Sequence, residues 1–344
     1  MLAKGNAVMS TSPETPSSDV PCSAPAHRVA PSDISPPSFL SRRALMTVGA
    51  ALTFVGCAAP SQGVSSTSGA GAATNGARTD AFTQHRFTSA DGTSLSYFRQ
   101  GQGPALVWVY GTLSTWGDWR DVASRLSPHF TNFVLERRGR GSSADGATYA
   151  LEREVEDVLA LMQEAGPGAS LFGHSLGAIL ALEAAARRPP ARLVLYEPPF
   201  PISQRIAPEA VETVRSAWKQ EGPDAALVAA QHHIFRMLTP EQLETFRQTP
   251  QWAKQLGMME TFLREISAVA DLPLGLERFR AMAIRTLVLL GDQSPRVLLA
   301  EPAHALTKML PHGALHVLPG QGHVAHVTAP SLLAREVDTF LTAP

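Results

Sequence analysis

Short apolar runs alternate with helical patterns along the chain from Phe82 onward. The runs that predict strands are 105–110, 132–136, 169–172, 192–196, 285–290 and 315–318. Helical periodicity is found at 151–164, 178–186 and 331–341. Two alternating runs, 85–89 and 94–99, flank Asp91-Gly92, which is a hairpin signal. Strands that alternate with helices in this way predict an α/β fold with a mostly parallel sheet.

The strand pattern stops between residues 201 and 279, where helical patterns follow one another. They cover 209–219, 223–236, 240–247, 251–256 and 259–268. We expect most of the large apolar side chains here to pack on one another, and a minority to face a pocket. These side chains are Trp218, Phe235, Met237, Trp252, Met258, Met259 and Phe262. The interval is therefore expected to be a helical insertion between two strands.

One stretch carries candidate chemistry, with Gly173, Ser175 and Gly177 spaced as Gly-x-Ser-x-Gly between a strand pattern and a helix pattern. A strand that turns sharply into a helix strains the middle residue, and flanking glycines avoid side-chain collisions. The hydroxyl then lies beside a helix N-terminus, where the N–H of Leu176 is free to bind an oxyanion. In this context the motif resembles the nucleophile elbow of the α/β-hydrolase superfamily.

This resemblance covers roughly 82–342 and implies an eight-stranded, mostly parallel sheet flanked by helices, with a helical cap inserted after the sixth strand. It also implies a histidine that takes the proton of Ser175. Gly322-His323 follows the run at 315–318 and resembles the histidine loop of the family, so His323 is the expected base. His326, three residues on, is the competitor and is expected to point elsewhere.

The histidine needs a carboxylate, and two strand ends offer one. The run at 285–290 is followed by Asp292, and the order Ser175, Asp292, His323 is the one that this superfamily uses. We therefore expect Asp292 to be the acid. Glu197 follows the run at 192–196, and for it we prefer a structural role at the cap entrance or beside an arginine such as Arg138.

The second donor of an oxyanion hole is expected from the loop after the run at 105–110. That loop contains Tyr110, Gly111 and Thr112, with Tyr110 where the family usually has His, and the N–H of Thr112 is the expected donor beside that of Leu176. Residues 136–143 resemble the Arg-Gly-x-Gly-x-Ser turn of the superfamily. We interpret this turn as scaffold, because the chain has no Gly-rich phosphate loop followed by Lys.

Composition narrows the function further. The 344 residues carry a formal net charge of -1, so no general attraction to nucleic acid or acidic membranes is implied. Cys22 and Cys57 both precede the predicted fold, so within it neither a disulfide framework nor a cysteine metal site is expected. The hydrolase resemblance implies no cofactor, and the oligomeric state is not readable from the sequence.

The first eighty residues differ in composition from the rest. Residues 1–39 are rich in Pro, Ser and Ala and predict a disordered leader, whose length leaves open whether Met1 is the true start. Arg42-Arg43 precedes an apolar run over 44–56, which is too short to span a bilayer. A basic pair before a short apolar stretch is typical of an export signal and resembles a twin-arginine signal, although Leu45 and Thr47 depart from that pattern.

The apolar run ends at Cys57-Ala58-Ala59, which resembles a bacterial lipoprotein cleavage site with Cys57 as the lipidated residue. The alternative is cleavage near Ala59 and a free product. We thus expect an export signal over 1–59, a flexible linker over 60–81, a core over 82–200 and 280–344, and a cap over 201–279. The expected location is the periplasm or cell surface.

The predicted function is hydrolysis of a small-molecule carboxylic ester through an acyl-enzyme on Ser175. Epoxide and haloalkane chemistry are disfavoured, because those members of the superfamily usually have Asp at the elbow. Acyl transfer and perhydrolysis use the same residues and stay open. A catalytically silent binding protein on the same fold is the third alternative.

Overall fold

The computed structural model describes residues 81–344. The export signal expected over 1–59, Cys57 within it, and the linker expected over 60–81 apart from Ala81 lie outside the described residues. Within 81–344, no helix is both long enough and apolar enough to cross a membrane.

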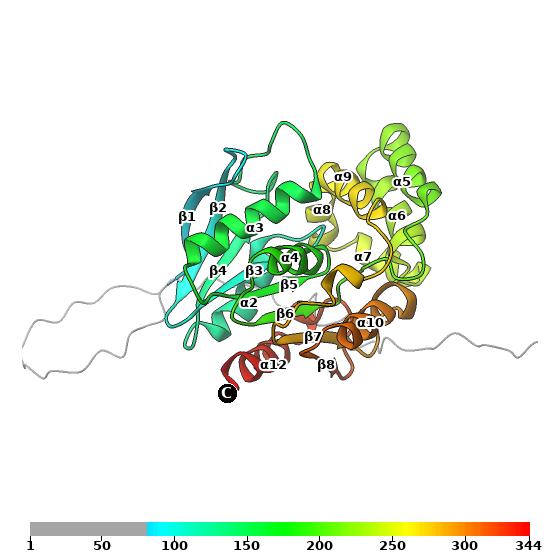
Figure 1. The fold of residues 1–344 in the computed structure, drawn as a ribbon. Helices are drawn as coiled ribbons and strands as arrows, with labels where there is room; N and C mark the ends of the chain where they lie inside the picture. Colours follow the sequence, from blue (N-terminus) through cyan, green and yellow to red (C-terminus); the bar gives the residue numbers. More distant parts are fainter. Residues whose placement is uncertain (1–80) are drawn as a thin grey trace, which may run out of the picture. The chain divides into compact units, whose positions relative to one another are not determined.

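The described strands form one eight-stranded sheet in the order β1-β2-β4-β3-β5-β6-β7-β8 (Figure 1). Their bounds are β1 Thr83–Thr88, β2 Ser94–Gly101, β3 Ala105–Val109, β4 Thr131–Glu136, β5 Ser170–His174, β6 Leu193–Tyr196, β7 Thr286–Gly291 and β8 Gly313–Leu318. β2 pairs antiparallel with β1 and β4, and all the other pairs are parallel. The mostly parallel sheet and the leading hairpin predicted from the sequence are confirmed.

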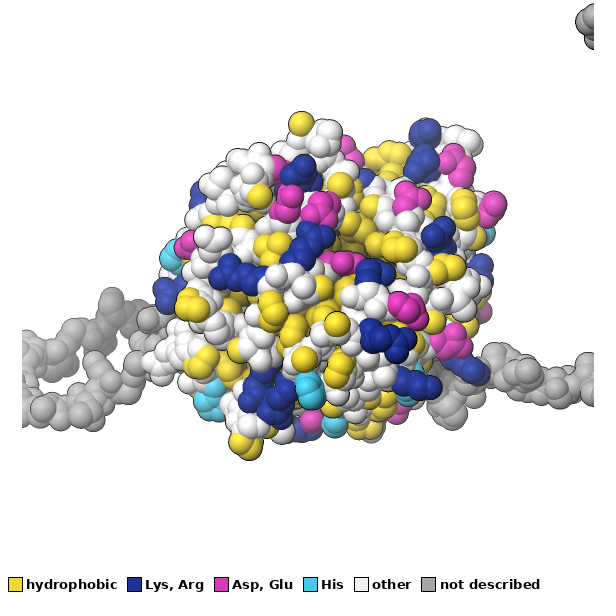
Figure 2. Space-filling model, viewed as in Figure 1, with side chains coloured by type: hydrophobic (Ala, Val, Ile, Leu, Met, Phe, Trp, Pro, Cys, Tyr) yellow, Lys and Arg dark blue, Asp and Glu magenta, His cyan; other side chains and the backbone are white. Residues whose placement is uncertain are grey.

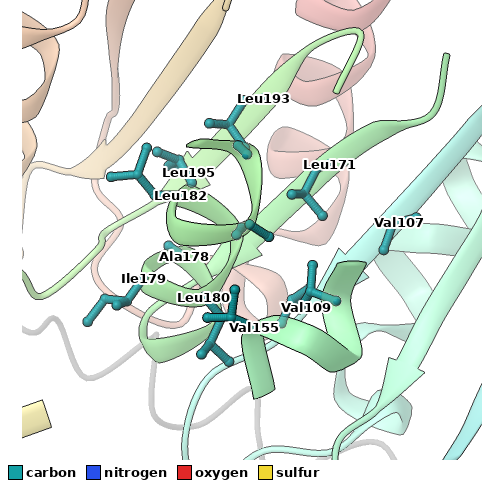
Figure 3. Close-up of a cluster of buried hydrophobic side chains, with 14 of the residues drawn as sticks. Val107, Val109, Val155, Leu171, Ala178, Ile179, Leu180, Leu182, Leu193 and Leu195 are labelled. Carbon is teal, nitrogen blue, oxygen red and sulfur yellow. The ribbon is translucent and has the colours of Figure 1, made fainter. Parts of the chain in front are cut away.

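Helices cover both faces of the sheet, which explains why its strands are apolar at consecutive positions. Val107 and Val109 of β3 face the cluster formed with α3 and α4, whereas Leu106 and Trp108 face the cluster formed with α2 and α12. Figure 3 shows the first of these clusters, with the side chains of α4 set between those of β3, β5 and β6. The covering helices are α2 Trp116–Leu126, α3 Leu151–Ala165, α4 Leu176–Arg187, α10 Glu301–Met309, α11 Ala325–Thr328 and α12 Pro330–Thr342.

Three of these helices, α2, α10 and the short α11, were not among the elements predicted from the sequence. The N-terminus of α2 carries a recognisable signal, a capping box in which Asp118 accepts a hydrogen bond from the N–H of Thr115 at 2.8 Å. Pro302 near the start of α10 is a second conventional start signal.

The cap lies between β6 and β7 and has a hydrophobic core of its own. Its helices are α5 Pro208–Glu221, α6 Pro223–Ala230, η1 Gln231–Phe235, α7 Pro240–Arg247, α8 Pro250–Leu256 and α9 Met259–Ala270. Trp252 and Met259 are buried in that core, as expected for cap packing. The two ends of the insertion meet where the N–H of Gly275 donates to the carbonyl of Pro201 at 3.0 Å.

The surface agrees with the near-zero net charge. On the face drawn in Figure 2, Lys and Arg side chains are interspersed with Asp and Glu, and none of the blue or magenta groups merges into a single-sign patch. This face therefore offers no basic footprint for a nucleic acid.

Candidate active site

Ser175 lies at the turn between β5 and α4 with φ 54° and ψ -126°, a conformation that L-residues rarely adopt. The neighbouring glycines leave no room for a side chain. A Cβ at Gly173 would lie 2.5 Å from the carbonyl oxygen of Gly177, and one at Gly177 would lie 2.1 Å from that of Val109. The strained strand-to-helix turn predicted from the motif is present.

The imidazole of His323 contacts the carboxylate of Glu197, with Nδ1 2.6 Å from Oε2. His323 lies on the loop after β8, and Glu197 is the first residue after β6. The contact favours the tautomer with the proton on Nδ1, which leaves Nε2 free to accept a proton. The sequence analysis predicted Asp292 as the acid. The structure contradicts this prediction, because the carboxylate beside His323 belongs to Glu197 and not to Asp292.

Glu197 is fully buried, and both of its carboxylate oxygens have hydrogen-bond partners. Its Oε1 accepts from the N–H of Gly291 at 2.7 Å and from the hydroxyl of Ser294, so only Oε2 is left for His323. Its backbone has φ 49°, a second strained non-glycine residue at this site. The contact with Arg138 that was one expectation for Glu197 is not seen, because Arg138 pairs with Asp157 instead.

Asp292 follows β7, as expected, but its side chain is exposed and is bonded to its own turn and to the backbone of the loop after β8. It accepts from the side-chain amide of Gln293 at 3.0 Å. Hydrogen bonds from the backbone at Gly320, then from the side chain of Gln293, hold the pKa of the Asp292 carboxyl below its usual value. The residue stabilises the turn beside the histidine loop and does not contact His323.

The loop after β3 places the second expected oxyanion donor over Ser175. A Cβ at Gly111 would lie 2.6 Å from Cβ of Ser175, so only glycine permits this approach. Within residues 81–344, neither the N–H of Thr112 nor that of Leu176 is bonded to another protein group. Both donors are thus available to an oxyanion formed at Ser175.

Two further histidines pack behind the site. His326 is buried and stacks on Trp119 with ring centroids 4.3 Å apart, so it points away from Ser175 as expected. His174 precedes the serine, and its Nε2 lies 3.0 Å from the carbonyl oxygen of His323. Burial lowers the pKa of His326 to about 3 and that of His174 well below its usual value, so both rings are neutral.

A cavity of about 50 Å³ opens over Ser175 and His323. Apart from these two residues and Thr112, its lining is entirely apolar: Leu176, Pro199, Ile206, Ile234, Phe235, Met237, Phe262, Ile266, Val269, Leu298 and Leu299. Three of the cap residues singled out in the sequence, Phe235, Met237 and Phe262, belong to this lining, and the other four do not. Leu298 and Leu299 come from η3 Arg296–Ala300 and were not predicted.

The arginines of the 136–143 turn form ion pairs with buried carboxylates of the protein. Arg137 forms a bidentate ion pair with Glu154, at 2.6 and 2.7 Å, and Arg138 forms one with Asp157, at 2.7 Å for both bonds. Tyr110 is also buried, and its hydroxyl accepts from the N–H of Arg137 at 3.2 Å instead of facing the cavity. The turn acts as scaffold, as predicted, since neither Arg137 nor Arg138 is free to bind phosphate.

Residues 105–336 match the alpha/beta hydrolase family. The chain belongs to this family. An alpha/beta hydrolase from Sphaerobacter thermophilus is 31% identical, has a TM-score of 0.67, and aligns over 75% of this chain and 100% of that one. The chain is accordingly an enzyme of the hydrolase type.

Curated relatives cover the chain to different extents. An N-formylmaleamate deformylase of Pseudomonas putida is 38% identical over 140 residues, which is 38% of this chain and 52% of that protein, so this match spans about half of the relative's length. A pimeloyl-[acyl-carrier protein] methyl ester esterase of Xanthomonas campestris is 28% identical over 255 residues, which is 71% of this chain and 97% of that protein.

Proposed function

We propose that the protein is a serine hydrolase that cleaves a small carboxylic ester with an apolar acyl group. The observation that carries the proposal is the contact of 2.6 Å between the buried Glu197 and His323, which lines the same cavity as Ser175. A histidine oriented by a carboxylate beside a serine on a strained turn is the arrangement that activates a hydroxyl nucleophile.

In this proposal the residues act in a fixed order. Nε2 of His323 takes the proton of the Ser175 hydroxyl while Oγ attacks the acyl carbon, and Glu197 stabilises the imidazolium that forms. The N–H groups of Thr112 and Leu176 bind the oxyanion. His323 then protonates the departing alcohol, and a water molecule, deprotonated by the same ring, releases the acid from Ser175.

The cavity limits the acyl group. Its lining supplies no Arg or Lys, so a carboxylate on the acyl chain would be desolvated without a counter-charge. A volume of about 50 Å³ suits a short acyl chain. Among the relatives, the methyl ester esterase is similar to this chain over most of both proteins, which supports ester hydrolysis.

The test combines labelling with turnover on the full chain. A fluorophosphonate probe should modify Ser175, as mapped by mass spectrometry, and p-nitrophenyl esters should be cleaved, with short acyl chains preferred. Ser175→Ala should lose both reactions. Labelling without ester cleavage would favour acyl transfer or perhydrolysis, and absence of labelling would favour a catalytically silent binding protein.

We also propose that the protein is exported and anchored by a lipid on Cys57. The order of an arginine pair, a short apolar run and Cys57 supports this location. The mature protein should begin at a modified Cys57 and fractionate with membranes, and Cys57→Ser should move it to the soluble exported fraction. A mature N-terminus near Ala59 in the wild type would contradict the anchor.

A further inference from the structure

The guanidinium of Arg137 contacts the loop that carries one oxyanion donor. Its Nη1 donates to the carbonyl oxygen of Gly111 at 2.9 Å, and its backbone N–H donates to the hydroxyl of Tyr110 at 3.2 Å. Arg137 itself is 1% exposed. Two consecutive residues of the loop are therefore held from below by one buried arginine.

The carbonyl of Gly111 and the N–H of Thr112 belong to the same peptide unit. Because that unit is planar and trans, the two groups point in opposite directions. A cation that holds the carbonyl oxygen therefore fixes the direction of the N–H, and it also polarises the peptide so that the N–H is a stronger donor. The next residue, Leu113, has φ 51°, so the loop leaves this peptide through a strained conformation.

Arg137 is held by carboxylates from both parts of the fold. Glu154 of α3 binds it from the core, and Glu265 of cap helix α9 binds its Nη2 at 3.0 Å. Glu265 is also buried and accepts from Arg140 at 2.6 Å. Its neighbour on α9, Ile266, lines the cavity. The cap helix that lines the cavity thus also contacts the arginine beneath the oxyanion loop.

We propose that Arg137 is a positioning residue for the oxyanion hole, which it orients and polarises through the Gly111–Thr112 peptide, and that Glu265 makes this orientation depend on the seated cap. The inference rests on the proposed ester hydrolysis at Ser175. It assigns Arg137 no contact with substrate, because the guanidinium is bonded to Gly111, Glu154 and Glu265.

The test compares Arg137 with its neighbour Arg138, which is also buried and bidentate but bonds Asp157 and not the loop. In the full chain, Arg137→Lys should lower kcat roughly 10- to 100-fold, with KM nearly unchanged, because the oxyanion is stabilised only in the transition state. Both variants should lose a similar amount of thermal stability, but Arg138→Lys should keep kcat near that of the wild type.

An inhibitor pair separates positioning from general damage. An aryl trifluoromethyl ketone, which Ser175 converts to a tetrahedral oxyanion, should bind Arg137→Lys more weakly by the same factor as kcat falls. The corresponding methyl ketone should bind the wild type and Arg137→Lys equally. Equal loss of kcat in both arginine variants, or a loss confined to KM, would overturn the proposal.

Glu265→Gln provides a second variant in case the arginine variants do not fold. It keeps an oxygen for Arg137 and Arg140 but removes the charge, so kcat and trifluoromethyl ketone affinity should fall together by roughly several-fold. Unchanged kcat in a folded Glu265→Gln would contradict the role of the cap. A wild type without esterase turnover or labelling would instead refute the proposed function.

Discussion

The Nδ1 atom of His323 lies 2.6 Å from Oε2 of Glu197, and the other oxygen of that carboxylate is held by the N–H of Gly291. Glu197 thus joins the histidine loop to the end of β7. Because the carboxylate is fully buried and its backbone is strained at φ 49°, its direction is imposed by the fold.

Removing the charge of Glu197 should disable the base. Glu197→Gln keeps the shape but can present its amide N–H₂ to Nδ1, which favours the wrong tautomer, so kcat should fall on the order of 10³- to 10⁴-fold. Asp292→Asn is the matched control and should stay within about twofold of the wild type, because Asp292 does not contact His323. Steady-state kinetics on both variants measure this, and a larger loss in Asp292→Asn would restore the acid favoured by sequence order.

Adding one methyl group to the oxyanion loop, on the side that faces Ser175, should block the nucleophile. In Gly111→Ala the new Cβ would lie 2.6 Å from Cβ and 3.2 Å from Oγ of Ser175, so the loop or the serine must move. We expect kcat to fall by roughly 10²-fold or more, as for the loss of one oxyanion donor.

The control for that substitution is Gly117→Ala in α2, where the nearest atom to a new Cβ is 3.6 Å away. This variant should keep full activity and gain up to about 1 kcal/mol of stability, since alanine is the better helix former. Thermal unfolding and fluorophosphonate labelling rates measure both variants. Normal labelling of Gly111→Ala would show that the loop does not close on Ser175.

Shortening Phe262 should enlarge the acyl site. Its ring is fully buried, lines the cavity and lies 5.5 Å from the ring of Phe235. Phe262→Ala should cost roughly 3–5 kcal/mol of stability and shift the preference among p-nitrophenyl esters to longer chains.

Met259→Ala is the matched control for the acyl site. Met259 lies on the same helix and is equally buried, but it packs in the cap core and does not line the cavity. It should cost a comparable roughly 2–5 kcal/mol while leaving the chain-length profile unchanged. The same shift in both variants would mean that a loosened cap, and not the volume at Phe262, sets the preference.

The neutral His326 should make the protein sensitive to acid. Burial lowers its pKa to about 3; nearby Asp118 opposes this shift, and His323 and Lys254 add to it. Below the unfolded pKa of about 6.5, the unfolded chain therefore binds a proton that the folded chain does not. Stability is therefore lost as pH falls, by up to about 2 kcal/mol between about pH 7 and pH 5. His326→Phe, which keeps the stacking on Trp119, should reduce this loss.

Urea unfolding of the wild type and His326→Phe at both pH values measures the difference. His174 stays in both proteins and its pKa is also lowered, so part of the acid sensitivity should persist in the variant. An identical loss of stability in the two proteins would show that His326 is protonated or accessible in the folded state.

The sequence was enough to predict the sheet, the cap helices, the strained turn at Ser175 and the placement of His323 on its loop. The sheet and the cap helices follow from local periodicity, and the strained turn follows from glycines whose Cβ atoms would collide. The placement of His323 was implied by the resemblance of its loop to the histidine loop of the family. The acid was not predictable in this way. Glu197 and Asp292 both follow a strand, and only the positive φ at Glu197 and the inward bonds from Gly291 and Ser294 decide which carboxylate reaches the histidine.

The two ends of the cap insertion lie side by side, where the N–H of Gly275 donates a hydrogen bond to the carbonyl of Pro201. Because those ends meet, the whole insertion could be exchanged for that of another hydrolase without moving Ser175, Glu197 or His323. Such a chimera would inherit a new acyl selectivity. It would remain an efficient catalyst only if the incoming module presented a carboxylate to Arg137 where Glu265 now stands.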